Sequence, residues 1–480
     1  MNYKMVLKNL GIVLICEGIA MLPSLIVALL YGENSAWAFF YTILLLFIIG
    51  IPVSFIKPKH AGLYVKDGFA IVAIGWILVS FFGAFPFYFS GEIPSFVDSL
   101  FEASSGFTTT GASILQHIQG LPQGILFWRS FTHWVGGMGV LVLTMAILPS
   151  AGTGALKIMK AESPGPSPGK LVPRVKETAK ILYGIYLLMT MIEIMLLKIA
   201  GMPWYDAFIH TFGTVGTGGF SNMNLSVGAY NNVYIEIIIT VFMFLAGSNF
   251  ALYYQMLRGN LKAFFKDEEF RLYAFIVISA TVLIALNIYG TIYKGIGQSF
   301  RYSAFQVVSI TTTTGYATAD FNLWPVFSKV ILFFLMFVGG CAGSTGGSIK
   351  NIRILLLFKA AKRDLLRIIH PKAIYSVRLS GKAVSERILS EILGFFFMYM
   401  MVFCGAILIV SIDGKDLVTT VTAVAATIGN IGPGLGMVGP TGNFSGFSDL
   451  SKMVLSCCML IGRLEIYPIL LLFLPSFWKK

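Results

Sequence analysis

Four short stretches of threonine and glycine recur along an otherwise apolar chain of 480 residues. They read FTTTGAS, VGTGGFS, TTTGYAT and NIGPGLG, and we align them on one glycine each, namely Gly111, Gly218, Gly315 and Gly432. In three of them a threonine precedes the glycine, at Thr110, Thr217 and Thr314. Ten residues before the glycine, the same three repeats carry Phe101, Phe208 and Phe305. This periodicity predicts four copies of one structural unit.

The chemistry available to these stretches is that of backbone and hydroxyl oxygens. Extended backbone within a membrane leaves carbonyl oxygens without helical partners, which is tolerated where they line a water-filled path or pack against protein. Four such loops around one axis can replace the hydration shell of a monovalent cation, and glycine allows the dihedral angles that turn a carbonyl inward. The alternative is an ordinary helix cap with Ser or Thr and a C′ glycine, but four copies in register favour the cation site.

The composition indicates a membrane protein. Hydrophobic residues make up 56% and charged residues only 12%, with a mean hydropathy of +0.80, whereas soluble domains carry about 25% charged residues. The formal net charge of +13 is typical of Lys and Arg collected in cytoplasmic loops. We expect no nucleic-acid partner, because no basic run is interleaved with exposed aromatic residues. The five cysteines lie in apolar stretches without a CxxC pair, so we expect neither disulfides nor a zinc site.

Ten apolar runs are long enough to cross a bilayer. They lie near residues 9–30, 37–55, 68–90, 124–148, 179–201, 233–257, 270–290, 328–358, 388–412 and 452–474. Ten crossings put both termini on one side, and the basic connections predict that this side is the cytoplasm. Each Thr/Gly stretch follows an apolar segment too short to cross, which is typical of a re-entrant pore helix.

We therefore predict an all-α polytopic membrane protein, with a two-helix preface and four span–pore-helix–span repeats around one pseudo-fourfold pore. The predicted units are a preface over 1–66, a first repeat over 67–150, a cytoplasmic loop and second repeat over 151–267, a third repeat over 268–375 and a fourth over 376–480. The pore helices would aim their negative C-terminal ends at the central cavity, which favours a cation.

A second polar feature, GGCAGSTGGS, lies inside the eighth predicted span at residues 339–348. It is no phosphate-binding loop, because it lacks both the Lys-Ser/Thr pair and a preceding strand. Close helix packing through small residues is one interpretation. The other is a break in the helix, which beneath a filter is a candidate gate. We call residues 339–348 the gating loop, with candidate residues Gly339, Gly340, Gly343, Ser344, Thr345, Gly346 and Gly347.

Arg463 lies deep within the tenth predicted span. A charge there costs several kcal/mol unless it faces water or a partner. We expect Arg463 to face the pore below the filter, where its charge would raise the barrier to cations. The alternative is a structural ion pair, for example with Glu465 or Glu193.

Other charged residues lie near the predicted pore helices. Arg129 and His133 are one helical turn apart, and we expect them to brace the pore-helix region rather than to touch ions. Asp98, Glu102 and Asp206 would either concentrate cations at the outer mouth or serve in capping and ion pairs.

Several longer phrases carry a family resemblance over essentially the whole chain. They include FWRSFTHWVGGMGV, TTTTGYATADF, GGCAGSTGGSIK, HPKAIYSVRL, GNIGPGLG and MLIGRLEIYP. With the fourfold repeat, they make the chain resemble the superfamily of K⁺ transporters that includes the Trk, Ktr and plant HKT proteins. The two-helix preface resembles the bacterial Trk membrane subunits, TrkH and TrkG, because the Ktr membrane subunit begins directly with the first repeat.

The resemblance implies a filter made by the loop glycine and the two residues before it in each repeat. In this chain these residues are Thr109, Thr110, Gly111, Gly216, Thr217, Gly218, Thr313, Thr314, Gly315, Asn430, Ile431 and Gly432. Glycine in all four repeats is the K⁺-selective pattern, and the gating loop is implied to block the cytoplasmic half of the pore. K⁺ would bind at the filter only, as the transported ion, with no organic cofactor in this chain.

The resemblance further implies K⁺ uptake across the bacterial cytoplasmic (inner) membrane, gated by a cytosolic nucleotide-binding regulatory subunit of the Trk RCK type. It also implies a homodimer surrounded by membrane lipid. The basic connection 350–387 and the loop 150–176 are candidate docking surfaces, with anchoring to anionic lipid as the alternative. A Na⁺-permeable member of the superfamily and a secondary transporter for another solute are the alternative functions. We expect no enzyme, because HExxH and intramembrane clusters of His or carboxylates are absent from the sequence.

Overall fold

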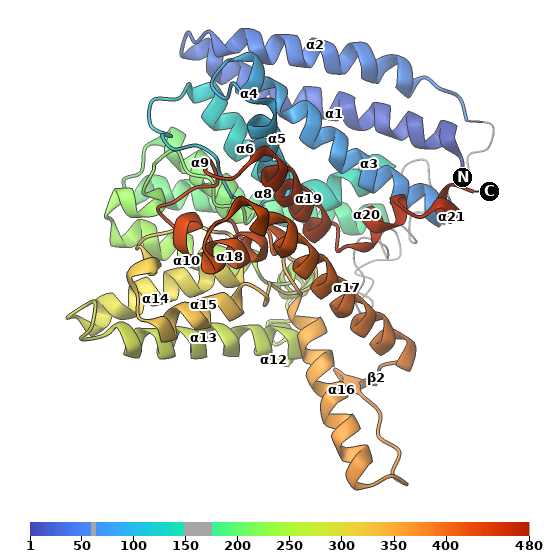
Figure 1. Cartoon of the computed structure of the whole chain (residues 1–480), viewed down its shortest axis with the longest axis vertical. Coiled ribbons are helices and arrows are strands. Elements are labelled where there is room, and N and C mark those ends of the chain that lie inside the picture. Colours follow the sequence, from blue (N-terminus) through green and yellow to red (C-terminus); the bar gives the residue numbers. More distant parts are fainter. Residues whose placement is uncertain (59–63, 148–174, 480) are drawn as a thin grey trace.

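The computed structural model describes residues 1–58, 64–147 and 175–479, and within them the regular secondary structure is almost entirely helical (Figure 1). Two short strands in this part of the chain, β1 (Arg378–Leu379) and β2 (Lys382–Ala383), pair antiparallel as a hairpin. The predicted all-α membrane fold is confirmed. The candidate docking loop 150–176 falls almost entirely outside the described residues.

The preface consists of α1 (Tyr3–Leu30) and α2 (Ser35–Ser54), which lie side by side at one edge of the molecule (Figure 1). Their backbones approach closely at two glycines, because a Cβ on Gly11 would lie 2.8 Å from the Gly50 carbonyl oxygen. α1 also packs against α3 and α6 of the first repeat. The preface therefore flanks the repeats rather than contributing to their centre.

Four repeats follow, each with a span, a short pore helix, a loop and a second helical segment. The first contains α3 (Val65–Gly83), α4 (Phe85–Phe89), α5 (Phe96–Phe107) and α6 (Gln123–Ile147). The second contains α8 (Val175–Ile199), α9 (Trp204–Val215), η3 (Ser226–Tyr230), α10 (Val233–Ala246), α11 (Phe250–Leu257) and α12 (Ala263–Lys266). The third contains α13 (Glu268–Ile288), α14 (Ile296–Thr311), η4 (Phe321–Leu323), α15 (Val326–Leu335) and α16 (Asn351–Ile369). The fourth contains α17 (Glu386–Val410), η5 (Ser411–Asp413), α18 (Leu417–Ile428), η6 (Gly436–Val438), α19 (Asp449–Arg463), α20 (Tyr467–Leu472) and α21 (Pro475–Trp478).

Three of the ten predicted spans are not continuous helices. Within the described residues, six helices are long and apolar enough to span a membrane, or seven if the bent pair α10–α11 counts as one span. That pair bends by 94°. The eighth predicted span is interrupted between α15 and α16, as its glycine content predicts. The tenth ends at Arg463, because Glu465 and Ile466 adopt positive φ angles of 54° and 72°, which a right-handed helix excludes.

The gating loop explains the bend in the sixth span. The Asn249 side chain caps α11, and the loop supplies partners for the backbone groups that the bend leaves free. The Cys341 N–H donates to the Gly247 carbonyl at 2.8 Å, and the Phe250 N–H donates to the Gly343 carbonyl at 3.1 Å. Polar backbone inside a membrane requires such partners, so the bend and the gating loop stabilise each other.

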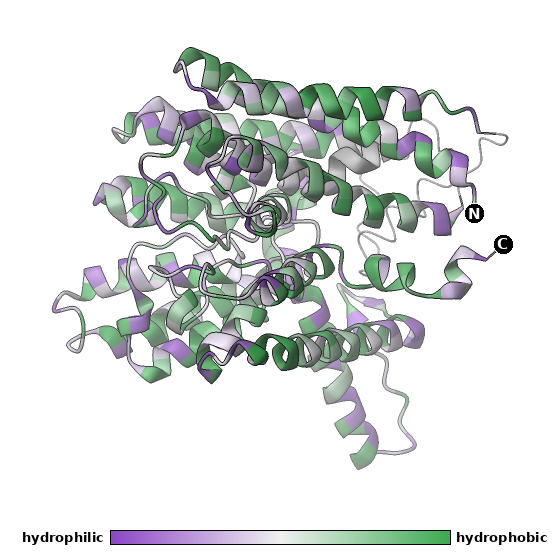
Figure 2. Ribbon diagram, turned by 45° about the horizontal axis from the view of Figure 1, so that its top comes forward, coloured by the Kyte–Doolittle hydropathy of each residue, from purple (hydrophilic) through white to green (hydrophobic). Residues whose placement is uncertain are grey.

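Hydrophobic residues dominate the long helices, as Figure 2 shows. α16 is different, because it projects from the body of the molecule together with the β1–β2 hairpin (Figure 1). Two of its ion pairs connect it to the neighbouring spans, Lys359 with Glu268 of α13 and Arg363 with Glu386 of α17. These pairs fix the projecting helix to the spans on either side of it.

Candidate functional site

The four pore helices, α5, α9, α14 and α18, end in the same way. The second residue after each helix takes a left-handed backbone conformation, and these residues are Thr109, Thr217, Thr313 and Asn430, with φ angles of 54°, 55°, 59° and 54°. In every repeat the next amide N–H donates to the carbonyl five residues earlier, at 2.8–2.9 Å. Because a positive φ is uncommon outside glycine, these four residues mark one shared loop structure.

Two residues further on, each loop places a glycine against the backbone of the next loop. These glycines are Gly111, Gly219, Gly315 and Gly432, with φ angles of 77°, 79°, 85° and 96°. A Cβ on them would lie 2.0, 2.0, 2.1 and 2.7 Å, respectively, from the carbonyl oxygens of Gly218, Thr314, Ile431 and Thr110. The contacts run from the first repeat through the fourth and back to the first. The four loops, which we call the filter loops, therefore form a closed ring.

This ring corrects the sequence alignment of the second repeat by one residue. Gly219, not Gly218, occupies the position of Gly111, and Gly216 is instead the C-cap residue of α9 with a φ of −74°. The correction also applies to the pore helix, where Ile209 is fully buried whereas Phe208 is 37% exposed. The equivalent loop residues of the second repeat are therefore Thr217, Gly218 and Gly219. The sequence alignment selected the wrong glycine because Gly218 and Gly219 are adjacent, and because Thr217–Gly218 resembles the Thr-Gly pairs of the first and third repeats.

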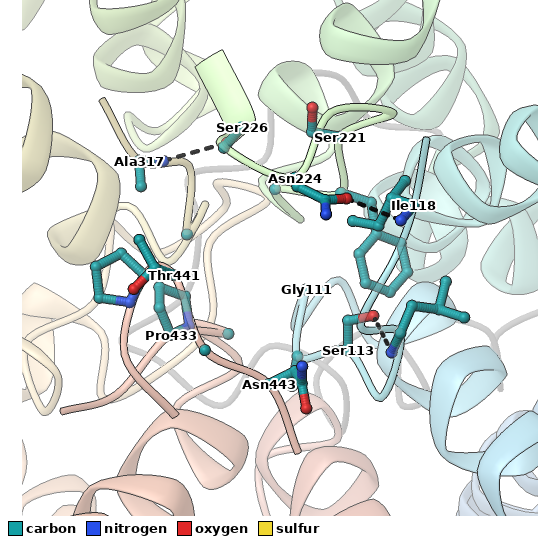
Figure 3. A pocket seen from close by; sticks show the side chains of 18 of the residues that line it. Gly111, Ser113, Ile118, Ser221, Asn224, Ser226, Ala317, Pro433, Thr441 and Asn443 are labelled. Atoms are coloured by element: carbon teal, nitrogen blue, oxygen red, sulfur yellow. Dashed lines mark hydrogen bonds between the residues drawn. The ribbon is translucent and has the colours of Figure 1, made fainter. Parts of the chain in front are cut away.

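A pocket of about 130 Å³ lies against the ring (Figure 3). All four ring glycines line it, together with outer loop residues that include Ser113, Asn224 and Asn443. Hydrogen bonds between residues of different repeats stabilise the wall of the pocket. The Ile118 N–H donates to Asn224 Oδ1 at 2.8 Å, and the Phe444 N–H donates to the Ser113 carbonyl at 2.8 Å. We call this pocket, which the ring glycines border, the vestibule.

A buried ion pair braces the first and second filter loops. Arg129 Nε lies 2.5 Å from Glu102 Oε1, and both side chains are at most 2% exposed. Arg129 Nη1 donates to the Ser221 carbonyl at 2.9 Å, and Ser113 Oγ donates to Glu102 Oε1 at 2.9 Å. The expected bracing role of Arg129 is confirmed. The Glu102 carboxylate is buried away from the vestibule, and its role is that of an ion-pair partner for Arg129.

His133 braces the same two loops from behind. The Phe220 N–H donates to His133 Nε2 at 3.1 Å, so Nδ1 carries the proton that is donated to the Gly106 carbonyl at 2.8 Å.

Asp206 accepts from Asn222 Nδ2 at 2.7 Å and from the Tyr230 hydroxyl at 2.8 Å. Asp98 follows the ion-pair alternative, because its Oδ1 lies 2.5 Å from Lys452 Nζ. Asp206 instead accepts hydrogen bonds from neutral side chains, and within the described residues it is in neither an ion pair nor a helix cap.

Tyr316 is a positioning residue that the sequence did not explain. Its hydroxyl lies 3.0 Å from the His210 carbonyl oxygen and 3.2 Å from that of Phe220, across the boundary between the second and third repeats. Gly213 provides the space, because a Cβ there would lie 2.1 Å from the Tyr316 hydroxyl. The pairing of one bulky residue with a glycine about one hundred positions away could not be recognised without the repeat geometry.

The gating loop packs against the inner ends of the pore helices. Thr345 Oγ1 lies 3.1 Å from the Val215 carbonyl at the end of α9 and 3.3 Å from that of Ala246. Four of its glycines approach backbone closely. An added Cβ would lie 2.1 Å from the Gly347 carbonyl oxygen on Gly339, 2.8 Å from that of Gly247 on Gly340, 3.0 Å from that of Thr312 on Gly346 and 2.7 Å from that of Gly429 on Gly347. Gly343 has a φ of 76°, and Ser344 Oγ donates to the Cys341 carbonyl at 2.6 Å. The gating loop is thus held against the pore-helix ends by hydrogen bonds and close backbone contacts.

Arg463 connects the gating loop to the first repeat. Its Nη1 donates to the Thr345 carbonyl at 2.7 Å, and its Nη2 donates to the Gly136 carbonyl at 2.9 Å. Glu465, the partner considered from the sequence, forms an ion pair with Arg353 instead. Arg463 therefore lies at the gating loop, with its guanidinium bonded to one carbonyl of the loop and one of α6.

The sequence matches the family model for TrkH, described as a cation transport protein, over residues 35–480. The chain belongs to this TrkH family. It is 41% identical to the Trk system potassium uptake protein TrkH of Salmonella typhimurium and 36% identical to TrkG of Escherichia coli, with 100% of this chain and 99–100% of each relative covered. The crystal structure of the potassium transporter TrkH from Vibrio parahaemolyticus superposes with a TM-score of 0.90 at 37% identity, covering both chains completely. With its apolar helices, this makes the chain a multi-pass inner-membrane protein.

Proposed function

We propose that this chain takes up potassium ions through a selectivity filter made by the four filter loops. The filter residues are Thr109, Thr110, Gly111, Thr217, Gly218, Gly219, Thr313, Thr314, Gly315, Asn430, Ile431 and Gly432. The observation that carries the proposal is the closed ring of glycine–carbonyl contacts, because a ring of carbonyl oxygens can substitute for the hydration shell of K⁺. The potassium uptake activity named for the relatives supports the same ion. The chain thus acts as a transporter, and K⁺ is the ion that it carries.

The pore helices add an electrostatic contribution. All four end immediately before the filter loops, so their negative C-terminal dipole ends surround the ring. The field favours a cation over an anion without a carboxylate in the path. Glycine at all four ring positions lets each loop approach the carbonyl of the next, and the potassium uptake named for the relatives supports K⁺ rather than Na⁺ as the cargo.

The gating loop and Arg463 are proposed to close the cytoplasmic half of the path. The loop fills the space below three pore-helix ends, and the Arg463 charge opposes the passage of cations. Opening requires the Arg463 bonds to Thr345 and Gly136 to break. We propose that a cytosolic nucleotide-binding subunit of the Trk RCK type supplies this work by docking on the basic connection 350–387, which continues directly from the loop, and that the chain functions as a homodimer.

Flux into liposomes tests this proposal. Purified protein in potassium-loaded vesicles should exchange external Rb⁺ for K⁺, faster with the cytosolic partner present, and with little uptake of Na⁺. Equal Rb⁺ and Na⁺ uptake would identify a Na⁺-permeable member of the family. Absence of any alkali-cation flux, with and without the partner, would overturn the proposal.

A further inference from the structure

The gating loop is bonded directly to one filter loop. The Gly347 N–H donates to Thr313 Oγ1 at 2.6 Å, and both residues are buried. Only glycine permits this approach, because a Cβ on Gly347 would lie 2.7 Å from the Gly429 carbonyl oxygen and 2.9 Å from Asn430 Cβ. A backbone amide of the gate thus occupies a side-chain oxygen of the proposed filter.

In the part of the chain that the structure describes, the equivalent side chains of the other three repeats make no hydrogen bond to the gating loop. Among the described residues, Thr109 Oγ1 and Asn430 Oδ1 are buried and have no hydrogen-bond partner. Thr217 Oγ1 donates to the adjacent Gly216 carbonyl at 2.7 Å, which leaves its lone pairs free to accept. Buried oxygens without a partner are rare in folded proteins, and a bound cation would satisfy them.

We propose that these four side-chain oxygens form an inner site for the transported monovalent cation, and that the gating loop competes with the cation for the oxygen of Thr313. An amide N–H and a cation are both electropositive and both require the lone pairs of the hydroxyl oxygen. When the loop is closed, the Gly347 N–H therefore occupies the oxygen that would be the fourth ligand of the cation. Binding of the cation at this site weakens the hydrogen bond that holds the gating loop. This inference rests on the proposed function, since the cation is the one that the filter conducts.

Hydrogen exchange of the full-length protein in lipid nanodiscs tests the competition. The peptide containing Gly347 should exchange about fivefold faster in saturating K⁺ than in choline, the ratio equivalent to one hydrogen bond of about 1 kcal/mol. In the variant Thr313→Val, which removes the hydroxyl at nearly constant volume, exchange should be fast in both cations. Thr313→Ser keeps the oxygen and should restore the difference between K⁺ and choline.

Thr217→Val is the matched control, because Thr217 occupies the equivalent position but its hydroxyl donates to the adjacent Gly216 carbonyl instead of accepting from the gating loop. It should reduce Rb⁺ flux while the gating loop keeps the protection of the wild type in choline. If the loop of wild-type protein exchanged at the same rate in K⁺ and choline, or if Thr313→Val protected it as well as wild type, the inference would be overturned.

The flux assay separates this inference from the proposed function. Wild-type protein that conducts Rb⁺ but shows no K⁺ effect on the gating loop contradicts the inner site alone. Protein that conducts no alkali cation contradicts the proposed function itself.

Discussion

Gly219→Ala is the substitution that most sharply tests the ring of filter loops. The new Cβ would lie 2.0 Å from the Thr314 carbonyl oxygen, and carbon–oxygen contacts under 3.0 Å essentially never occur. The carbonyl must therefore move by about 1 Å, which is enough to remove it as an ion ligand. The φ of 79° adds strain of about 1–2 kcal/mol for a residue with a side chain. We expect Rb⁺ flux into liposomes to fall on the order of tenfold or more, and discrimination against Na⁺ to weaken.

Gly201→Ala provides the matched control. Gly201 lies in the same repeat and has a φ of 97°, but a Cβ there meets no atom within 4 Å. Gly201→Ala therefore introduces the backbone strain of a positive φ without a clash between the new Cβ and a carbonyl oxygen, so Rb⁺ flux should stay close to that of the wild type. The reasoning would be refuted if Gly219→Ala protein were folded and conducted as well as Gly201→Ala, because the ring would then not line the path.

The remaining substitutions test the supports around the filter. Arg463→Ala removes the bonds to Thr345 and Gly136 and should raise unstimulated Rb⁺ flux several-fold; flux equal to wild type would exclude Arg463 from the gate. Glu102→Gln leaves Arg129 buried without its counter-charge, which should lower the free energy of unfolding by about 3–5 kcal/mol, seen as a lower Tm, and an unchanged Tm would mean that the pair contributes nothing. Tyr316→Phe removes one hydrogen bond of about 1 kcal/mol and should reduce Rb⁺ over Na⁺ selectivity with little change in Tm; retained selectivity would exclude the hydroxyl as a filter support.

The repeated architecture was predictable because its signals are local. Each pore helix is a short apolar segment followed by threonine and glycine, and each signal can be recognised within about twenty residues of sequence. The gating loop was predictable for the same reason, since five glycines in ten residues destabilise a helix wherever they occur.

The register of the second repeat could not be decided in this way. Gly218 and Gly219 are adjacent and chemically identical, and they are distinguished by the folded structure, in which Gly219 has the positive φ and lies against the Thr314 carbonyl. The bend of α10–α11 was missed for a related reason, because its freed backbone groups are satisfied by the gating loop about ninety residues later. Likewise, the partners of Arg463 are backbone carbonyls, which no sequence pattern identifies.

Locating bound ions in the filter would test the central claim most directly. Crystals of the protein grown or soaked with Tl⁺, a K⁺ mimic with strong anomalous scattering, should reveal density on the axis of the filter loops. We predict a peak at coordination distance from the carbonyl oxygens of Thr110, Gly218, Thr314 and Ile431. Tl⁺ bound elsewhere in the protein, with none among these four oxygens, would contradict the account.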